Sequence, residues 1–592
     1  KGNYYVVFDC ADEESGRLAA EKAVLIAQNL VDGTETDIDQ HVEEIRIKNL
    51  ENTPGPSTAS ILREAAARDI PAIKLEDNSS WQLGYGCNQK RISATITSST
   101  SHTAVEIVCN KESCRNLLKS MSVPIAKGTA IESLDELKHS IDSLGFPLVI
   151  KPADGNQGRG VTTNITTFGQ AEKALRFAST VCERVIVERY IPGFDYRLLM
   201  VDGKLAAAAK RTPAHVVGDG KSSIQQLIDE VNSDPQRGDG HENVLTKIQA
   251  GPAAKFILSR KNYTLNTVLE INEILYLDYV ANLSKGGTAE DITDQVHPDV
   301  VKAAERVSKI TGLDICGIDI MAQTLTKPLA ETGGVVLEVN AAPGFRMHLA
   351  PSIGVPRNVA SPVMDMLFPE GKCSRIPIIA VTGTNGKTTT TRLISHIMRE
   401  AGRRVGYTTT DGIYVNDELL MEGDCGGPKS AEMILKDPTV DTAVLECARG
   451  GILRAGLGFD RCDVAVVTNV AADHLGIKGI HTIDQMAHVK SVVPESVRPG
   501  GYAVLNADDD RVYAMRKNVQ CRLVLYSMKD DNTRLIRHRK AGGLCVVFTD
   551  KAVTIWDGPD THTIENVENI PLSFGGRALF MIENILAAVA VA

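Results

Sequence analysis

The sequence has few of the features that mark secreted, membrane-spanning or zinc-stabilised proteins. Its 12 cysteines are scattered over 592 residues, and no two are spaced as a C-x-x-C pair. The sequence therefore predicts neither a disulfide framework nor a zinc site. It contains no uninterrupted apolar run near the ~18 residues that a membrane span needs, and no signal peptide. These absences predict a cytoplasmic protein with reduced thiols and no membrane partner.

Positive charge is also scarce. The chain has 64 lysines and arginines against 74 aspartates and glutamates, which gives a net charge of −10 at pH 7. We therefore expect no nucleic-acid partner, because nothing offsets the repulsion from a phosphate backbone. A nucleotide can still bind, since that needs only a local nest of backbone N–H groups. At ~100–200 residues per domain, the length predicts three or four domains.

The chain divides into three predicted regions, which together predict a multidomain α/β protein. Residues 1–104 mix short strands and helices, and they predict a small α+β domain with no chemistry that we can name. Residues 105–369 contain the apolar strand patterns 147–152, 185–190 and 198–201. Residues 370–592 alternate apolar strands with helical stretches, which indicates a parallel sheet.

A glycine-rich loop in the third region predicts a phosphate-binding site. An apolar strand runs directly into the loop, and helix-forming residues follow it. In such a loop the lysine reaches the β- and γ-phosphates, and the following threonine hydroxyl binds Mg²⁺. The general motif asks for glycine where this chain has Val381, so the loop is a variant. A plain glycine turn is the alternative, which the Lys-Thr pair disfavours. The predicted phosphate contacts are Gly383, Thr384, Asn385, Gly386, Lys387, Thr388 and Thr389.

This variant loop and the residues after it resemble the middle domain of the Mur ligases and folylpolyglutamate synthetases. The resemblance implies that Glu446 binds Mg²⁺ and that His474 approaches a second metal. It places Lys490 where many members carry a carbamylated lysine, and Asn584 near the adenine. Residues 580–581 are Phe-Met where the pattern has His-Asn. Each of these residues alone could be a buried ion-pair or solvated residue, but their order behind the loop favours the functional interpretation.

The second region resembles an ATP-grasp domain, in which a nucleotide lies between two sheets and is held by lysines and a flexible glycine loop. The implied nucleotide contacts are Lys111, Lys151, Gly155, Gly158, Gly160 and Glu188.

A set of oxygen-bearing side chains in this region predicts a metal site. Asp319 lies in a short apolar strand, and Glu338 and Asn340 point to one face of another strand because strand side chains alternate. Carboxylate and amide oxygens suit Mg²⁺ that bridges ATP phosphates. A solvent-facing acidic strand is the alternative, and it fits poorly with the apolar residues on both sides.

Both regions imply the same chemistry. A carboxylate attacks the γ-phosphate of ATP, and an amine then displaces phosphate from the acyl phosphate to form an amide. Mg²⁺ and lysines neutralise the charge on the transferred phosphoryl group. Lys210 and Arg211 are candidate partners of the phosphorylated intermediate, and a solvated basic turn is an equally weighted alternative. Arg346 lies on a predicted substrate-side loop. The sequence thus predicts an ATP-dependent amide-bond ligase with two sites.

An ATP-grasp module followed by a Mur-ligase-like module resembles the cyanophycin synthetase family over essentially the whole chain. The segments that carry the resemblance are 53–57, 89–92, 154–160, 281–288, 446–454 and 575–581. It implies a protein that adds aspartate to a growing polymer or primer at the ATP-grasp site and couples arginine to the aspartate β-carboxylate at the Mur-like site. We also expect a homo-oligomer. The implied substrate contacts are Asn282, Ser284, Gly286, Gly287, Arg449 and Arg454, with turn and helix-cap roles as the alternative.

Three alternatives stay open. Mur ligases carry a third domain after the middle one, and we expect this lid to be absent from a chain that ends at Ala592. A shortened relative would polymerise β-aspartyl-arginine dipeptide with only the ATP-grasp site active, although the intact 383–388 loop and Glu446 favour two working sites. A glutathione-like synthetase fused to a Mur-like partner is the second alternative. The third is a nucleotide-gated binding or scaffold protein, which the retained lysines and carboxylates disfavour.

Overall fold

The computed structural model describes residue 6 and residues 8–10, 12–76, 79–153, 160–238, 244–472, 475–476 and 479–592. The chain divides into two compact units. Unit 1 comprises residues 1–68, 73–81 and 91–370, and unit 2 comprises residues 69–72, 82–90 and 371–592. The three predicted domains stay a prediction, because this division groups the first two of them together. No helix in the described ranges is long and apolar enough to cross a membrane.

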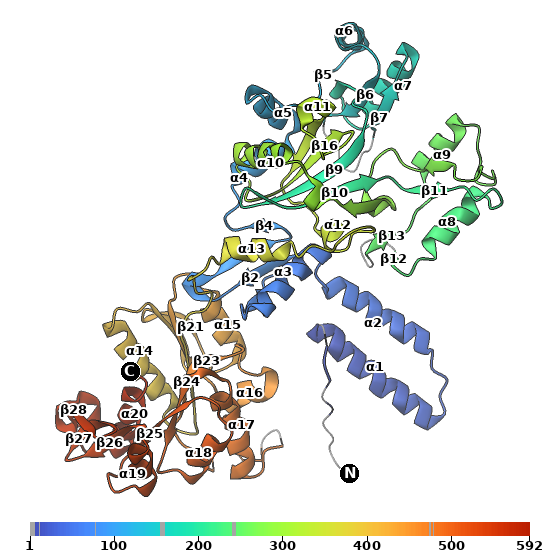
Figure 1. Ribbon diagram of the computed structural model, residues 1–592. Coiled ribbons are helices and arrows are strands. Elements are labelled where there is room, and N and C mark those ends of the chain that lie inside the picture. Colours follow the sequence, from blue (N-terminus) through green and yellow to red (C-terminus); the bar gives the residue numbers. More distant parts are fainter. Residues whose placement is uncertain are drawn as a thin grey trace. The chain divides into compact units, whose positions relative to one another are not determined.

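Unit 1 begins with helices whose ends follow from single residues. Asp12 and Asp37 each accept a backbone hydrogen bond at the first turn of a helix, and Gly33 ends the first helix with a positive φ of 71°. The helices are α1 (Glu13–Asp32), α2 (Ile38–Asn52) and α3 (Pro56–Ala67). Helices α1 and α2 lie side by side as a pair (Figure 1). Short strands follow in the sequence, and their residues 72, 82, 83 and 90 belong to unit 2: β1 (Ala72–Lys74), β2 (Ser80–Leu83), β3 (Lys90–Ser93) and β4 (Ile96–Thr97).

Two antiparallel sheets form the centre of unit 1. The smaller has the order β5-β8-β6-β7 and packs on two helices. Its elements are β5 (Gly128–Ile131), α6 (Leu134–Leu144), β6 (Leu148–Pro152), β7 (Thr162–Ile165), α7 (Phe168–Ser179) and β8 (Val185–Arg189). The larger has the order β15-β10-β9-β16-β17. Its strands are β9 (Phe194–Val201), β10 (Lys204–Thr212), β15 (Thr288–Asp291), β16 (Ile315–Ala322) and β17 (Val335–Asn340).

The two faces of the larger sheet differ in character. Leu198, Met200, Ile318 and Ile320 are fully or almost fully buried on one face, which packs on a helical layer. That layer consists of α4 (His102–Cys109), α5 (Lys111–Ser120) and α10 (Pro298–Thr311). Because strand side chains alternate, the residues between these apolar positions point to the other face. This second face carries the charged residues of the first candidate site.

The chain between β10 and β15 forms a separate small core around Val216, Leu227 and Leu275. Its elements are β11 (His215–Val217), α8 (Ile224–Asn232), β12 (Arg237–Gly238), β13 (Leu245–Thr246), α9 (Pro252–Arg260) and β14 (Ile274–Tyr276). Three short helices complete the unit: α11 (Leu329–Thr332), α12 (Arg346–Leu349) and α13 (Ala360–Leu367).

Unit 2 is built on one 11-stranded sheet of the order β21-β20-β19-β22-β18-β23-β24-β25-β26-β27-β28. The strands from β19 to β26 in this order pair in parallel, as the alternation of strands and helices predicts. They are β18 (Ile378–Thr382), β19 (Val405–Thr409), β22 (Thr442–Glu446), β23 (Cys462–Val467), β24 (Val497–Asn506), β25 (Arg522–Ser527) and β26 (Leu544–Thr549).

Antiparallel hairpins extend this sheet at both edges, so it is mixed, whereas we predicted a parallel sheet. The added strands are β20 (Gly412–Val415), β21 (Glu418–Glu422), β27 (Ala552–Asp557) and β28 (Asp560–Asn566). Two-residue turns precede β21 and β27, and all four turn residues have positive φ: Asn416, Asp417, Asp550 and Lys551. Turns of this kind match the twist of hairpins. The helices of the unit are α14 (Lys387–Glu400), α15 (Pro428–Lys436), α16 (Arg449–Ala455), α17 (Ile483–Glu495), α18 (Asp510–Ala514), α19 (Thr533–Lys540) and α20 (Leu579–Val589).

Candidate active sites

Four charged side chains form a buried ionic network on the polar face of the larger sheet in unit 1. Asp195 and Arg197 lie on β9, Arg211 on β10 and Asp319 on β16. Both Nε and Nη2 of Arg197 donate to Asp319, with Nη2 3.0 Å from Oδ2. Arg211 Nη2 lies 3.0 Å from the same oxygen and 2.5 Å from Asp195 Oδ1. The charges therefore alternate along the network, which allows four ionic groups to be buried together.

The two arginines keep Asp319 ionised. Its side chain is almost fully buried, and burial opposes ionisation of its carboxyl. The charges and hydrogen bonds of Arg197 and Arg211 outweigh this effect and lower the pKa of Asp319 to about 2. Burial likewise opposes the charge of Arg211, but Asp319 and Asp195 outweigh it and raise the pKa of that guanidinium.

Glu338 and Asn340 join Asp319, as the alternation on β17 predicts. Asp319 is the direct cross-strand partner of Glu338. Asn340 Nδ2 lies 3.4 Å from Glu338 Oε1 and 3.5 Å from Asp319 Oδ2. This donor set contains only hard oxygens besides the amide nitrogen, which suits Mg²⁺. No group of three or more His, Cys, Asp or Glu side chains that could hold a metal occurs in the described chain, and Mg²⁺ with a nucleotide needs only one or two carboxylates.

The predicted nucleotide lysines of unit 1 contact carboxylates. Lys111 Nζ lies 3.9 Å from Glu338 Oε2, and Lys151 Nζ lies 2.8 Å from Glu188 Oε2. Glu188 is 8% exposed and also pairs with Arg115, which donates to the backbone oxygens of Ala126 and Gly128 at 2.7 and 2.9 Å. These contacts fix Glu188 and Lys151 on the smaller sheet. A nucleotide that entered would compete with carboxylates for both lysines.

Other predicted residues of unit 1 lie apart from this network. Lys210 points to the opposite face of the sheet from Arg211, because the two are neighbours on one strand, and its ammonium lies over the Phe194 ring. Gly155 and Gly158 lie outside the described residues. Gly160 has a positive φ of 74° where the loop rejoins the sheet.

The predicted substrate segment 282–287 forms a tight turn. Asn282 Oδ1 accepts a hydrogen bond from Ser284 N at 3.1 Å, and Gly286 has a φ of 91°. A Cβ on Gly287 would meet the backbone oxygens of Asn282 and Thr212 at 2.9 Å. The turn role that we weighed as an alternative is therefore present. A substrate role for this segment stays a prediction.

Arg346 is an anchored residue in the same part of unit 1. It donates to Thr246 Oγ1 at 3.1 Å, and burial lowers the pKa of its guanidinium. Arg237 binds the backbone oxygens of Thr246 and Gly286 at 2.6 and 3.1 Å. Thr246 and Arg237 together therefore link Arg346 to the 282–287 turn.

In unit 2 the predicted phosphate loop has the strand–loop–helix arrangement that its sequence indicates. It follows β18, and Gly386 (φ 82°) immediately precedes α14. Lys387 Nζ donates to the backbone oxygen of Thr384 at 3.0 Å. The backbone N–H groups at the start of α14 have no partner within the helix, as at any helix N-terminus, so they form an anion site.

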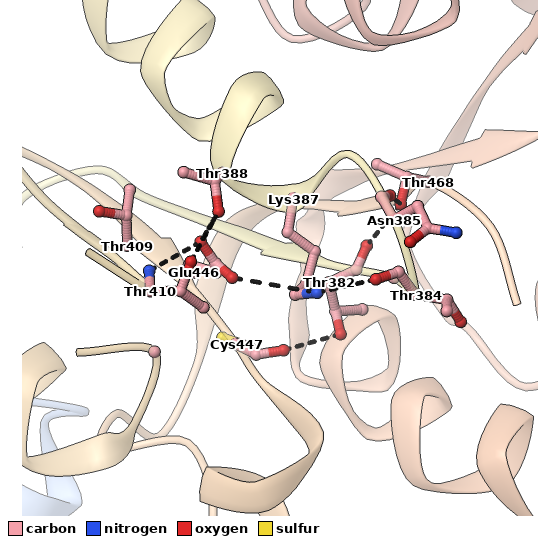
Figure 2. Close-up of polar contacts among 12 residues, drawn as sticks. Thr382, Thr384, Asn385, Lys387, Thr388, Thr409, Thr410, Glu446, Cys447 and Thr468 are labelled. Carbon is pink, nitrogen blue, oxygen red and sulfur yellow. Dashed lines mark hydrogen bonds and ion pairs between the residues drawn. The ribbon is translucent and has the colours of Figure 1, made fainter. Parts of the chain in front are cut away.

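Glu446 faces the loop from the end of β22. Its Oε2 accepts hydrogen bonds from Thr388 Oγ1 at 2.9 Å and Thr410 N at 3.3 Å, and its Oε1 lies 4.0 Å from Lys387 Nζ (Figure 2). Glu446 is 2% exposed, and burial raises the pKa of its carboxyl, with Thr388 and Lys387 acting against the shift. Within the described chain, Oε1 is buried without a hydrogen bond. Such an orphaned oxygen beside a threonine hydroxyl fits a Mg²⁺ ligand.

The strand end after β23 braces the phosphate loop. Asn469 accepts hydrogen bonds from Thr384 N at its backbone oxygen (2.8 Å) and from Asn385 N at its side chain (2.9 Å). Thr468 Oγ1 donates to Asn385 O at 2.6 Å, as Figure 2 shows. Lys490 is 3% exposed and donates to Gly383 O at 2.5 Å. Lys490 therefore contacts the loop, whereas His474 lies outside the described residues.

Helix α20 closes the other side of the loop. Asn584 Oδ1 accepts a hydrogen bond from Thr390 Oγ1 at 3.4 Å, and a Cβ on Gly386 would lie 2.2 Å from the same oxygen. Glycine at this position therefore permits the loop and α20 to approach each other. Glu583 accepts from Asn506 Nδ2 at 2.6 Å, which ties the helix to the end of β24.

The predicted substrate arginines of unit 2 lie on α16. Arg449 begins the helix, and Arg454 Nε donates to the backbone oxygen of Gly450 within the same helix at 2.9 Å. Arg454 thus makes a hydrogen bond within its own helix, as the alternative interpretation expects. Substrate contact stays a prediction for both Arg449 and Arg454.

Three residues that shape the site of unit 1 were not predicted from the sequence: Arg115, Asp195 and Arg197. A signal existed for two of them. Arg115 follows Lys111 by one helical turn, and Arg197 occupies an apolar strand where a buried charge demands a partner. The pairing of Arg197 with Asp319 depends on the register between β9 and β16, which the sequence alone does not reveal.

Both units match known protein families. The Mur ligase middle domain family matches residues 381–592, and two ATP-binding families match unit 1. These are the carbamoyl-phosphate synthase L chain ATP-binding domain at residues 110–197 and the RimK-like ATP-grasp domain at 272–363. A cyanophycin synthetase of Synechocystis sp. is 51% identical over 593 residues, covering 99% of this chain and 68% of that protein. The chain belongs to the cyanophycin synthetase family.

Other relatives agree with this membership. The cyanophycin synthetase of Trichormus variabilis is 51% identical over 591 residues, covering 99% of the chain and 66% of that protein. The chain therefore spans about two thirds of the length of these relatives. A bifunctional glutathione biosynthesis protein of Clostridium perfringens is 28% identical over 278 residues, 46% of this chain and 36% of that protein. The glutathione-like alternative thus matches less of the chain at lower identity.

We expect Asp319→Asn to destabilise unit 1. The substitution leaves Arg197 and Arg211 without a full counter-charge, a change that typically costs ~3–5 kcal/mol. The folded pKa of Asp319 is lowered to about 2, so its stabilisation is fully present above its unfolded pKa and is lost as the pH falls toward 2. The difference in the free energy of unfolding between wild type and Asp319→Asn should therefore be constant from pH ~8 to ~5, as measured by urea unfolding.

Arg176→Gln provides the control for this measurement, since Arg176 pairs with Glu172 on the helix surface. It should change stability by no more than ~0.5 kcal/mol. Equal effects of the two substitutions would contradict the buried network.

We expect Gly386→Ala to abolish nucleotide binding by unit 2, because its Cβ displaces Asn584 from the loop. Gly402→Ala is a matched control. Gly402 has the same φ of 82°, but its Cβ would meet nothing within 4 Å. Both variants carry the backbone strain of ~1 kcal/mol, so the loss of one of the chain's two binding sites in Gly386→Ala alone, titrated with a fluorescent ATP analogue, isolates the contact with Asn584. Equal binding by the two variants would refute the contact.

Proposed function

We propose that this chain performs the two ATP-dependent ligations that its relatives' name implies. Unit 1 would add aspartate to the backbone of a growing polymer, and unit 2 would couple arginine to the aspartate β-carboxylate. The observation that carries this proposal is the 51% identity to cyanophycin synthetases over 99% of the chain. The presence of one phosphate-binding arrangement in each unit supports it.

In unit 1 the acyl phosphate would form on the polymer's terminal carboxylate. Lys111 and Lys151 carry the positive charge for the ATP phosphates, and both already lie beside carboxylates that orient them. Arg211 is held in place by Asp195 and Asp319 and stays charged, so it would bind the acyl phosphate without first having to be ordered. The amine of aspartate then displaces phosphate, and the amide forms.

In unit 2 the side-chain carboxylate of the newly added aspartate would take the phosphoryl group. Lys387 and the backbone N–H groups at the start of α14 would bind the phosphates. The brace formed by Thr468, Asn469 and Lys490 keeps the loop in its curled shape before any nucleotide arrives. The amine of arginine then displaces phosphate.

The donor sets of both units fit Mg²⁺. Asp319, Glu338 and Asn340 would hold it in unit 1, and Thr388 and Glu446 would hold it in unit 2. When bound, it supplies neutralising charge to the transferred phosphoryl group. His474 stays a proposed ligand of a second metal.

The polymerisation of a preformed β-aspartyl-arginine dipeptide is the second candidate function. It needs only unit 1. The buried Glu446, the Thr388 hydroxyl beside it and Lys387 nearby would together bind phosphate and metal, and their proximity supports a working site in unit 2.

We expect Lys387→Ala to abolish arginine addition and to leave aspartate addition measurable. The lysine neutralises developing charge in unit 2 alone, and loss of such a group costs roughly 100-fold or more. Mass spectrometry of a primer incubated with ATP, aspartate and arginine, together and singly, measures both additions. Lys540→Ala, at the exposed end of α19, is the matched control and should behave as wild type.

Glu338→Gln should have the reverse effect, with aspartate addition lost and arginine addition to an aspartate-terminated primer retained. Glu331→Gln on α11 serves as its control. If each active-site variant abolishes both additions, the assignment of one ligation to each unit is wrong. If wild type extends a primer with the dipeptide but never with free amino acids, the second candidate function holds instead.

A further inference from the structure

A second row of polar side chains lies on the face of the larger sheet that is opposite the ionic network. Lys210 on β10 is the cross-strand partner of Tyr196 on β9 and of Glu290 on β15. Because strand side chains alternate, this row points away from Asp195 and Arg211. None of the three residues takes part in the ligation chemistry proposed above.

The row borders a pocket of about 190 Å³. Phe194 and the amides of Gln295 and Gln323 also line it. Lys210 Nζ lies 3.9 Å from the centroid of the Phe194 ring, a cation–π contact that holds the ammonium at the pocket wall. The pocket therefore combines one cation, one anion and neutral hydrogen-bonding groups.

The two charges of this pocket do not neutralise each other. Lys210 and Glu290 are directly opposite on neighbouring strands, where ion pairs commonly form. Among the described residues, neither side chain forms an ion pair, and the Lys210 ammonium contacts the Phe194 ring instead. Both charges thus face the pocket with unused capacity, which is costly for partly buried groups unless a ligand or water satisfies them.

Tyr196 provides a third group that points to a ligand. It is 4% exposed and lines the pocket, and no described residue forms a hydrogen bond with its hydroxyl. Burial and the charge of Glu290 raise the pKa of Tyr196, so the hydroxyl keeps its proton and can donate. The hydroxyl is therefore available to form a hydrogen bond with a ligand in the pocket.

We propose that this pocket binds a free α-amino acid, whose carboxylate pairs with Lys210 and whose ammonium pairs with Glu290. A zwitterion satisfies both charges at once. An anion such as phosphate would leave Glu290 unpaired and repelled, and a simple amine would do the same to Lys210. The proposal does not depend on which substrates the two ligase sites use.

Isothermal titration of the full chain with glycine, L-aspartate and L-arginine tests this site. We expect at least one probe to bind, and Lys210→Gln and Glu290→Gln each to weaken that binding by roughly tenfold or more, because each removes one charge-assisted contact. Lys204→Gln, at the exposed start of the same strand, should leave it unchanged.

Titration of wild type with N-acetylglycine and glycine methyl ester provides a measurement that needs no variant. Each compound lacks one of the two charges, so neither should bind at this site. A lack of binding by all three amino acids would overturn the proposal. Glycine binding that survives both charge-removing substitutions would overturn it as well, because glycine would then lie elsewhere. Lys210→Gln or Glu290→Gln could also weaken binding by unfolding the protein, which a melting temperature below that of Lys204→Gln would reveal. In that case the wild-type titrations decide, and the proposal is overturned if N-acetylglycine or glycine methyl ester binds as tightly as glycine.

Discussion

The position of Asp319 between Arg197 and Arg211 determines how unit 1 is built around its polar face. Three adjacent strands must align so that each carboxylate meets a guanidinium, since any unpaired member would be a buried charge. A shift of one residue in the register would send these side chains into the apolar core on the other face. The network thus constrains the register of β9, β10 and β16 in addition to forming the site.

A different constraint organises the candidate site of unit 2. There a single buried carboxylate, Glu446, meets the hydroxyl of Thr388 and lies close to Lys387, and one of its oxygens has no hydrogen bond in the described chain. In unit 1 the arginines satisfy the hydrogen-bonding capacity of the buried Asp319. In unit 2 part of the hydrogen-bonding capacity of Glu446 is not used within the described chain. The unused oxygen has a cost in the free protein, and a cation beside it would remove that cost. A metal ion bound with a nucleotide at this oxygen would therefore stabilise unit 2.

The sequence was sufficient for features that depend on local spacing. The loop from Gly383 to Thr388, the alternation of Glu338 and Asn340 and the parallel pairing of strands in unit 2 all follow from nearby residues. Features that depend on long-range register were not predictable in the same way. Arg197 and Asp319 are 122 residues apart, and only the pairing of β9 with β16 brings them together. The edge hairpins were missed because Asn416, Asp417, Asp550 and Lys551 form turns without the glycine that usually marks them.

The placement of Lys210 beside Arg211 shows how one strand supplies two unrelated environments. Prediction from the sequence treated the two residues as a pair, but a strand separates neighbours onto opposite faces. Arg211 consequently belongs to the ionic network, and Lys210 belongs to the pocket with Tyr196 and Glu290. Tyr196 likewise lies between Asp195 and Arg197 on β9. A displacement of β9 or β10 would therefore move residues of the ionic network and of the pocket together. Any coupling that exists between a ligand in the pocket and a ligand on the network must be equal in both directions, since it is a single free energy.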